Sequence, residues 1–97
     1  MGNIMDIRDL SERAIKCWGY DVQCVVAMEE LAELIQAVSK FYRGENNIEN
    51  LKEEIADVYI VLDQLRYMTF TDDEKLYDLI NTKIQRTLGA IYKHENK

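Results

Sequence analysis

Residues 28–34 read MEELAEL and residues 52–58 read KEEIADV, and these two stretches decide the fold. In both, apolar residues return every three or four positions, which is the spacing of an amphipathic helix and not of a strand. The chain of 97 residues has no proline and only four glycines, a composition that favours long helices joined by short turns. That length suits one domain, residues 1–97, and is too short for two. We therefore expect a single all-α domain.

Four helical segments can be placed from the apolar spacing and from the turn signals between them. They cover about residues 4–17, 22–43 and 48–68, followed by a segment that starts after Thr71 and reaches about Ile91. Asn3 and Asp21 are the predicted N-caps of the first two segments, and Gly19 is the predicted stop of the first. Because short connections make successive helices antiparallel neighbours, the sequence predicts a four-helix bundle.

Composition argues against several classes of protein. The net charge of −6 repels a phosphate backbone, so nucleic-acid binding is not expected. No apolar run approaches the roughly 20 residues that a membrane span needs, and the N-terminus lacks the basic and apolar regions of a signal peptide. We interpret Cys17 and Cys24 as two buried thiols in a reducing cytoplasm.

The acidic residues do not lie where water-facing charges of a helix would lie. On a helical wheel at about 100° per residue, Glu30 falls inside the apolar arc that contains Ala27 and Leu34. Glu54 falls between Val61 and Leu65 in the same way. Charge at helical spacing is ordinarily a solvated surface, and these two positions contradict that interpretation.

Each of these glutamates has an acidic neighbour three residues further on. Glu30 with Glu33, and Glu54 with Asp57, each project from one face of their helix. Burying several carboxylates together is unfavourable or forces them to take up protons, and a bound cation removes that difficulty. Hard oxygen ligands are what Mg²⁺ or Mn²⁺ prefers. The sequence therefore predicts a divalent metal site between the second and third helical segments, which could bring in a polyphosphate.

Two cations lie at the apolar arc of the last predicted helix. Lys83 falls inside this arc and Arg86 borders it. Either they extend to water or pair with the acids, or they hold a triphosphate against the metal. The wheel alone leaves both interpretations open.

The acidic pattern resembles the signature of the MazG-like all-α nucleoside triphosphate pyrophosphohydrolases, which is EExxE, a spacer and then ExxD. Here it stands as EELAE at 29–33, a spacer of 20 residues, and EIAD at 54–57. The similarity runs from about residue 18 to 86. The last helix also carries the NxKxxR pattern of many relatives, although Thr87 replaces the second arginine that often follows it.

This resemblance implies a role for each matching residue. It implies a magnesium site, with manganese as a substitute, and a triphosphate held by the last helix. Glu29 and Glu53 would bind a further ion or activate water, and Trp18 is a candidate for stacking on the base. The implied metal ligands are Glu30, Glu33, Glu54 and Asp57, and the implied phosphate contacts are Asn81, Lys83 and Arg86.

The implied reaction converts a nucleoside triphosphate and water into a nucleoside monophosphate and pyrophosphate, as in the removal of non-standard or excess nucleotides. The resemblance and the small core also imply a homodimer or homotetramer. A di-iron protein needs Glu-x-x-His motifs, which this chain lacks, since His94 in the tail is its single histidine. A non-catalytic helical module that binds metal or nucleotide, or acts in regulation, stays open as an alternative, as does the identity of the substrate.

Overall fold

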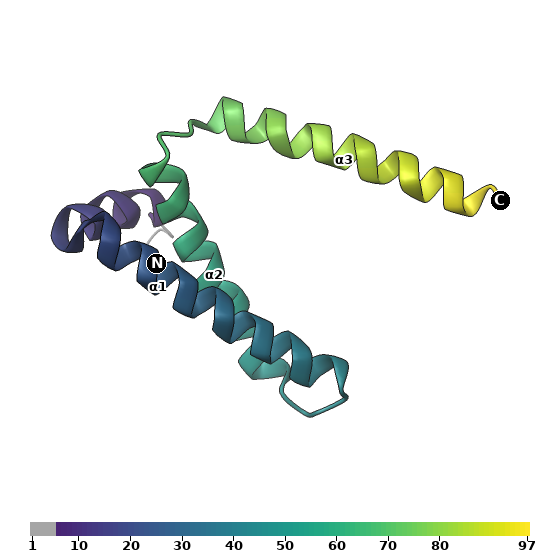
Figure 1. The fold of residues 1–97 in the computed structure, drawn as a ribbon, viewed down its shortest axis with the longest axis horizontal. Coiled ribbons are helices and arrows are strands. Elements are labelled where there is room, and N and C mark those ends of the chain that lie inside the picture. Colours follow the sequence, from purple (N-terminus) through teal and green to yellow (C-terminus); the bar gives the residue numbers. More distant parts are fainter. Residues whose placement is uncertain (1–5) are drawn as a thin grey trace.

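The structure is a computed structural model that describes residues 6–97 (Figure 1). It consists of three helices, α1 (Ile7–Tyr42), α2 (Ile48–Met68) and α3 (Asp73–Glu95), and the described residues contain no strand. The predicted all-α class is therefore confirmed. The predicted cap Asn3 and the first predicted helical residues lie outside the described part of the chain.

Gly19 bends α1 and does not end it. Its φ of 89° and ψ of 167° are non-helical, and helix runs on both sides of it, over residues 7–18 and 20–42. Glycine takes a positive φ without the steric penalty that a Cβ brings, so the bend falls at this residue. The predicted break was placed correctly, but the predicted N-cap Asp21 was wrong, because the chain is helical again before it reaches that residue.

The turn between α1 and α2 is closed by its own backbone. Gly44, with a φ of 81°, follows the last helical residues, while the amide of Glu45 donates to the carbonyl of Lys40 at 3.0 Å. This is the left-handed glycine ending that many helices use. The side chain of Asn47 then donates to the carbonyl of Ala37 at 3.0 Å, which ties the start of α2 back to α1.

The turn between α2 and α3 has the same form with a different residue at its centre. Phe70 takes the left-handed position, with a φ of 53°, and the amide of Thr71 donates to the carbonyl of Arg66 at 3.1 Å. Asp72 then caps α3 by accepting a hydrogen bond from the amide of Lys75 at 2.8 Å. The cap is thus one residue later than the predicted Thr71.

The α1 and α2 helices run antiparallel and form the core, and the 7–18 segment of α1 folds back beside the end of α2 (Figure 1). The core consists mainly of small and apolar side chains. Within it, the side-chain amide of Gln23 donates a hydrogen bond to the side-chain oxygen of Gln64 at 2.6 Å. The buried apolar residues are Ala14, Ile15, Ala27, Ala37, Val58, Val61 and Met68. The prediction that Cys17 and Cys24 are buried was wrong, because both are exposed on α1.

The α3 helix extends away from the α1–α2 pair and buries none of its residues (Figure 1). An ion pair between Arg8 and Asp73 links its first turn to α1. Within one chain α3, the last helix of the predicted bundle, therefore does not pack against the core. The closed four-helix bundle stays a prediction. No helix among the described residues is long and apolar enough to cross a membrane.

Candidate metal centre

Antiparallel packing brings the two acidic stretches of the sequence to the same level of the α1–α2 pair. The EELAE stretch lies in the middle of α1, and the EIAD stretch lies in the first half of α2. Carboxylate oxygens of Glu30, Glu33 and Glu54 all lie within 4.8 Å of one another. Three of the four predicted metal ligands therefore meet, although they come from two helices and are up to 24 positions apart in the sequence.

Two of these acids are partly buried in the helix interface. Glu30 and Glu54 are half-buried, and the Oε2 atom of each is buried without a hydrogen-bond partner. Glu33 is exposed at the side of the pair. Buried polar atoms are nearly always satisfied in folded proteins, so these two carboxylate oxygens must be balanced either by a proton shared with a neighbouring acid or by a bound cation.

Burial and mutual repulsion raise the pKa of both inner acids. For Glu30 the burial effect comes first, followed by the charges of Glu33, Asp57 and Glu29. For Glu54 burial again comes first, followed by the charges of Glu33, Asp57 and Glu30. Each of these effects disfavours the ionised carboxylate, and a nearby cation would reverse all of them.

The donor set fits a hard divalent cation. Three oxygens at about 2.1 Å from one Mg²⁺ can be mutually at most about 3.6 Å apart, and at about 2.5 Å from Ca²⁺ at most about 4.3 Å. The three oxygens lie within 4.8 Å of one another, so binding of either ion draws the carboxylates closer together, and Mg²⁺ requires the larger movement. Glu33 is exposed and can make that movement.

The other predicted acids lie around this cluster. Asp57 is exposed on α2 and is close enough for its charge to raise the pKa of Glu30 and Glu54, but it is not one of the three residues whose oxygens converge. Glu29 is exposed and acts on Glu30 in the same way. Glu53 is exposed on α2.

The predicted substrate residues are not brought to the acids within one chain. Asn81, Lys83 and Arg86 are exposed on α3, which leaves the α1–α2 pair after its first turn. Trp18 lies at the bend of α1 with 61 % of its surface exposed, so its ring is free to contact a ligand or another chain.

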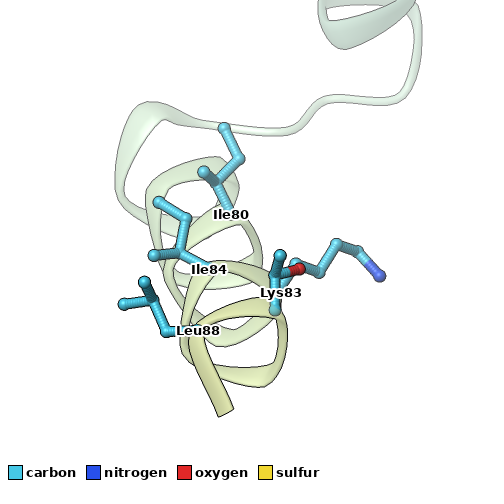
Figure 2. Close-up of a pocket in the computed structure, with 5 residues that line it drawn as sticks. Ile80, Lys83, Ile84 and Leu88 are labelled. Atoms are coloured by element: carbon cyan, nitrogen blue, oxygen red, sulfur yellow. The ribbon is translucent and has the colours of Figure 1, made fainter. Parts of the chain in front are cut away.

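A shallow hollow on α3 contains one of these residues. It is lined by residues of a single helix face, and the amine of Lys83 extends away from the row formed by Ile80, Ile84 and Leu88 (Figure 2). The helical wheel placed Lys83 inside the apolar arc, whereas in the structure this residue is exposed and its amine extends away from the apolar row (Figure 2). The lining residues are Ile80, Lys83, Ile84, Thr87 and Leu88.

Polar residues that connect α1 with α2 were missed at the level of the sequence. Ser11, fully buried, donates to Asp63 at 2.7 Å, and Arg66 donates to the same carboxylate at 2.7 Å. The buried pair Gln23 and Gln64 could have been identified from the sequence by helical spacing. Gln23 precedes the buried Ala27 by four residues and Gln64 follows the buried Val61 by three, so both lie on the core face of their helix. Polar side chains on a core face of a helix require partners on the facing helix.

Comparison with known proteins adds no assignment to this geometry. No family model matches the chain, and neither the curated proteins nor the solved structures include a match to it.

Proposed function

We propose that this chain is a magnesium-dependent nucleoside triphosphate pyrophosphohydrolase, in which manganese can replace magnesium. The observation that carries the proposal is the meeting of Glu30, Glu33 and Glu54 with two buried, unsatisfied carboxylate oxygens between them. Oxygen-only donors of this kind suit a cation whose remaining positions are filled by water and by phosphate oxygens. The resemblance to the MazG-like signature supplies the reaction.

Each acid of the site has a proposed role. The three converging glutamates, with Asp57 beside them, hold the ion. When bound, a divalent ion neutralises phosphate charge and makes a coordinated water easier to deprotonate. Glu29 or Glu53 accepts the proton of the attacking water, since both are exposed next to the ligand positions and reach solvent.

The phosphates and the base need groups outside the acidic cluster. Lys83, Arg86 and Asn81 contact the phosphates, and the two cations stabilise the charge of the departing pyrophosphate. Trp18 stacks on the base. Because α3 leaves the α1–α2 pair, this part of the proposal requires α3 to approach an acidic cluster in the assembled protein.

The broader setting of this enzyme is also proposed. We place it in the cytoplasm, acting on non-standard or excess nucleotides, as a homodimer or homotetramer in which a four-helix bundle is completed.

A panel of nucleoside triphosphates tests the function. Canonical and modified nucleotides are incubated with the full chain and Mg²⁺ or Mn²⁺, and pyrophosphate and orthophosphate are measured separately. Pyrophosphate together with the monophosphate is the expected outcome. Orthophosphate as the first product would contradict the assigned bond cleavage. Absence of turnover for every nucleotide, in a folded chain that binds the metal, would favour the non-catalytic binding module.

A further inference from the structure

The exposed apolar stripe of α3 is the largest feature that the proposed site does not use. Its residues recur at the spacing of one helix face, and none is buried. An isolated helix of this length has little stability in water without a packed face. The stripe consists of Leu76, Ile80, Ile84, Leu88 and Ile91, flanked by Tyr77 and Leu79.

The α1–α2 pair has an exposed apolar face of its own. On a helical wheel at about 100° per residue, the exposed apolar residues of each helix are displaced from its buried residues by about 70–130°. The displacement has the same rotational sense in both helices, for Val38 and Ile35 on α1 and for Leu62 and Ile55 on α2. Because the two helices are antiparallel, the same sense of rotation places all four residues on one side of the pair. This face comprises Met28, Ile35, Val38, Tyr42, Ile48, Ile55, Tyr59 and Leu62, all of which are exposed.

The size of the molecule shows how much surface one chain leaves uncovered. The accessible surface is 7788 Å², whereas a compact monomer of 11.4 kDa has about 5,800 Å². The radius of gyration is 16.6 Å, against about 12.5 Å for a compact domain of this length. The excess of about 2,000 Å² is more than the roughly 800 Å² that each partner buries in a standard interface.

The two parts of the chain that carry the apolar faces also differ in net charge. Residues 1–78 carry 8 basic and 17 acidic side chains, a net charge of −9, and residues 79–97 carry 4 and 1, a net charge of +3, which together give the −6 of the chain. The outer part of α3 is thus complementary to the α1–α2 pair. Opposite net charges favour docking of one on the other.

The turn before α3 directs the helix away from its own core. Arg66 donates to the carbonyl of Thr71 at 3.1 Å, the hydroxyls of Thr69 and Thr71 are 2.8 Å apart, and Arg8 pairs with Asp73. In the observed arrangement these contacts accompany an α3 that points away from its own α1–α2 pair, and docking of α3 on another chain leaves them unchanged.

We infer that two copies of this chain exchange their α3 helices, each α3 lying along the exposed apolar face of the α1–α2 pair of the other copy. One two-fold axis then covers both apolar faces at once, as in other exchanged dimers. The two segments of α1, α2 and the incoming α3 make four helices around each core. The inference specifies the self-association proposed above, and it holds whether or not the acids bind a metal.

Photo-crosslinking with isotope mixing tests this arrangement. The photo-reactive amino acid p-benzoylphenylalanine replaces Leu88, and ¹⁴N and ¹⁵N chains are mixed, unfolded, refolded and irradiated. Exchange predicts crosslinks from α3 to α1 or α2 peptides of the apolar face, with mixed-isotope pairs. The same amino acid at Thr82, which is exposed and lies about 180° from the centre of the stripe, is the control and should crosslink weakly. Crosslinks confined to single-isotope pairs, which would mean folding back within one chain, or no crosslinks at all, would overturn the inference.

Substitutions on α3 give an independent measurement. Ile84→Asp places a charge in the apolar stripe, and Thr82→Asp adds the same charge to the opposite side. Sedimentation equilibrium should give twice the 11.4 kDa of one chain, or a multiple of it, for the unsubstituted protein. Ile84→Asp should raise the dissociation constant by about 100-fold or more, since it buries an unpaired charge, while Thr82→Asp should change it little. An unsubstituted monomer, or an Ile84→Asp chain that associates normally, would overturn the inference.

Two controls keep this result separate from the proposed function. Circular dichroism reports whether the α1–α2 pair of the Ile84→Asp chain remains helical, and Mn²⁺ binding is measured on the same sample. A monomeric variant that still binds Mn²⁺ supports the inference independently of catalysis. If the variant does not fold, the crosslinking experiment alone decides.

Discussion

Glu30 on α1 and Glu54 on α2 each hold one carboxylate oxygen, Oε2, buried and without a hydrogen-bond partner within residues 6–97. Oxygens of both residues lie within 4.8 Å of each other and of an oxygen of Glu33. These two residues link the fold to the proposed chemistry. Burial between the helices raises the pKa of both carboxyl groups, and a bound cation would favour their ionised forms.

Removing one charge from the pair should abolish metal binding. Glu54→Gln keeps the size of the side chain and removes one of the converging anions, so we expect Mn²⁺ affinity measured by calorimetry, and any nucleotide turnover, to fall by about 100-fold or more. Glu49→Gln is the matched control on the same helix. Glu49 is exposed and pairs with Lys52 at 3.0 Å outside the cluster, so equal losses in both variants would contradict the site.

The stability of the metal-free chain should increase on mild acidification. The pKa of Glu30 and of Glu54 is raised above 4.5 in the folded chain, so the folded state binds more protons than the unfolded state just above that pH. Stability then falls as pH rises through this range. The Tm in a chelator should therefore be higher at about pH 5 than at about pH 7.

A double variant is the control for that pH dependence. Glu30→Gln with Glu54→Gln should have a nearly constant Tm over the same range and a higher Tm than the parent at neutral pH without metal. Asp63 and Asp73 have lowered pKa values, so the stability they contribute is lost only below 3.8 and leaves this range unaffected. If the Tm of the unsubstituted chain fell steadily on acidification, the raised pKa values of Glu30 and Glu54 would be contradicted.

Ser11 should stabilise the fold through Asp63. Burial alone would raise the pKa of Asp63, but hydrogen bonds from Arg66 and Ser11 outweigh it and lower the pKa. Ser11→Ala removes a fully buried donor to a charged acceptor, and we expect a loss of about 2 kcal/mol in the free energy of unfolding by chemical denaturation. Ser39→Ala removes an acceptor of the exposed Arg43 and should change stability by under about 0.5 kcal/mol.

Phe70 should be replaceable with a gain in stability. It occupies a left-handed turn position at a φ of 53° with 85 % of its surface exposed. Phe70→Gly relieves this backbone conformation and should raise the free energy of unfolding by about 1 kcal/mol. Phe70→Ala removes the same ring without relieving the backbone and is the control. A loss of stability in both variants would mean that the ring is covered in the assembled protein.

Helical spacing was sufficient to predict the all-α class and the bounds of α2, because amphipathic helices without proline have few alternatives. The wheel also placed Glu30 and Glu54 correctly at the helix interface. The apolar arc of α2 is wider than the part that is buried, since Val58 and Val61 lie in the core whereas Ile55 and Leu62 remain exposed. A wheel finds the apolar arc, but which part of that arc meets which neighbour depends on packing.

The direction of α3 could not be predicted from local signals. Its apolar stripe is as regular as that of a core helix, so the sequence predicts a packed neighbour. The ion pair of Arg8 with Asp73 and the left-handed Phe70 set its exit, and both depend on contacts or conformations that no periodicity reveals. The placement of Lys83 and Arg86 relative to the acids was beyond the sequence for the same reason.

Crystals of the full chain grown with Mn²⁺ and measured at a wavelength sensitive to manganese test the central claim most directly. The account predicts an anomalous peak bound by carboxylate oxygens of Glu30, Glu33 and Glu54, which disappears in Glu54→Gln crystals. A peak elsewhere, or Glu30 and Glu54 turned apart with no ion between them at millimolar Mn²⁺, would contradict it.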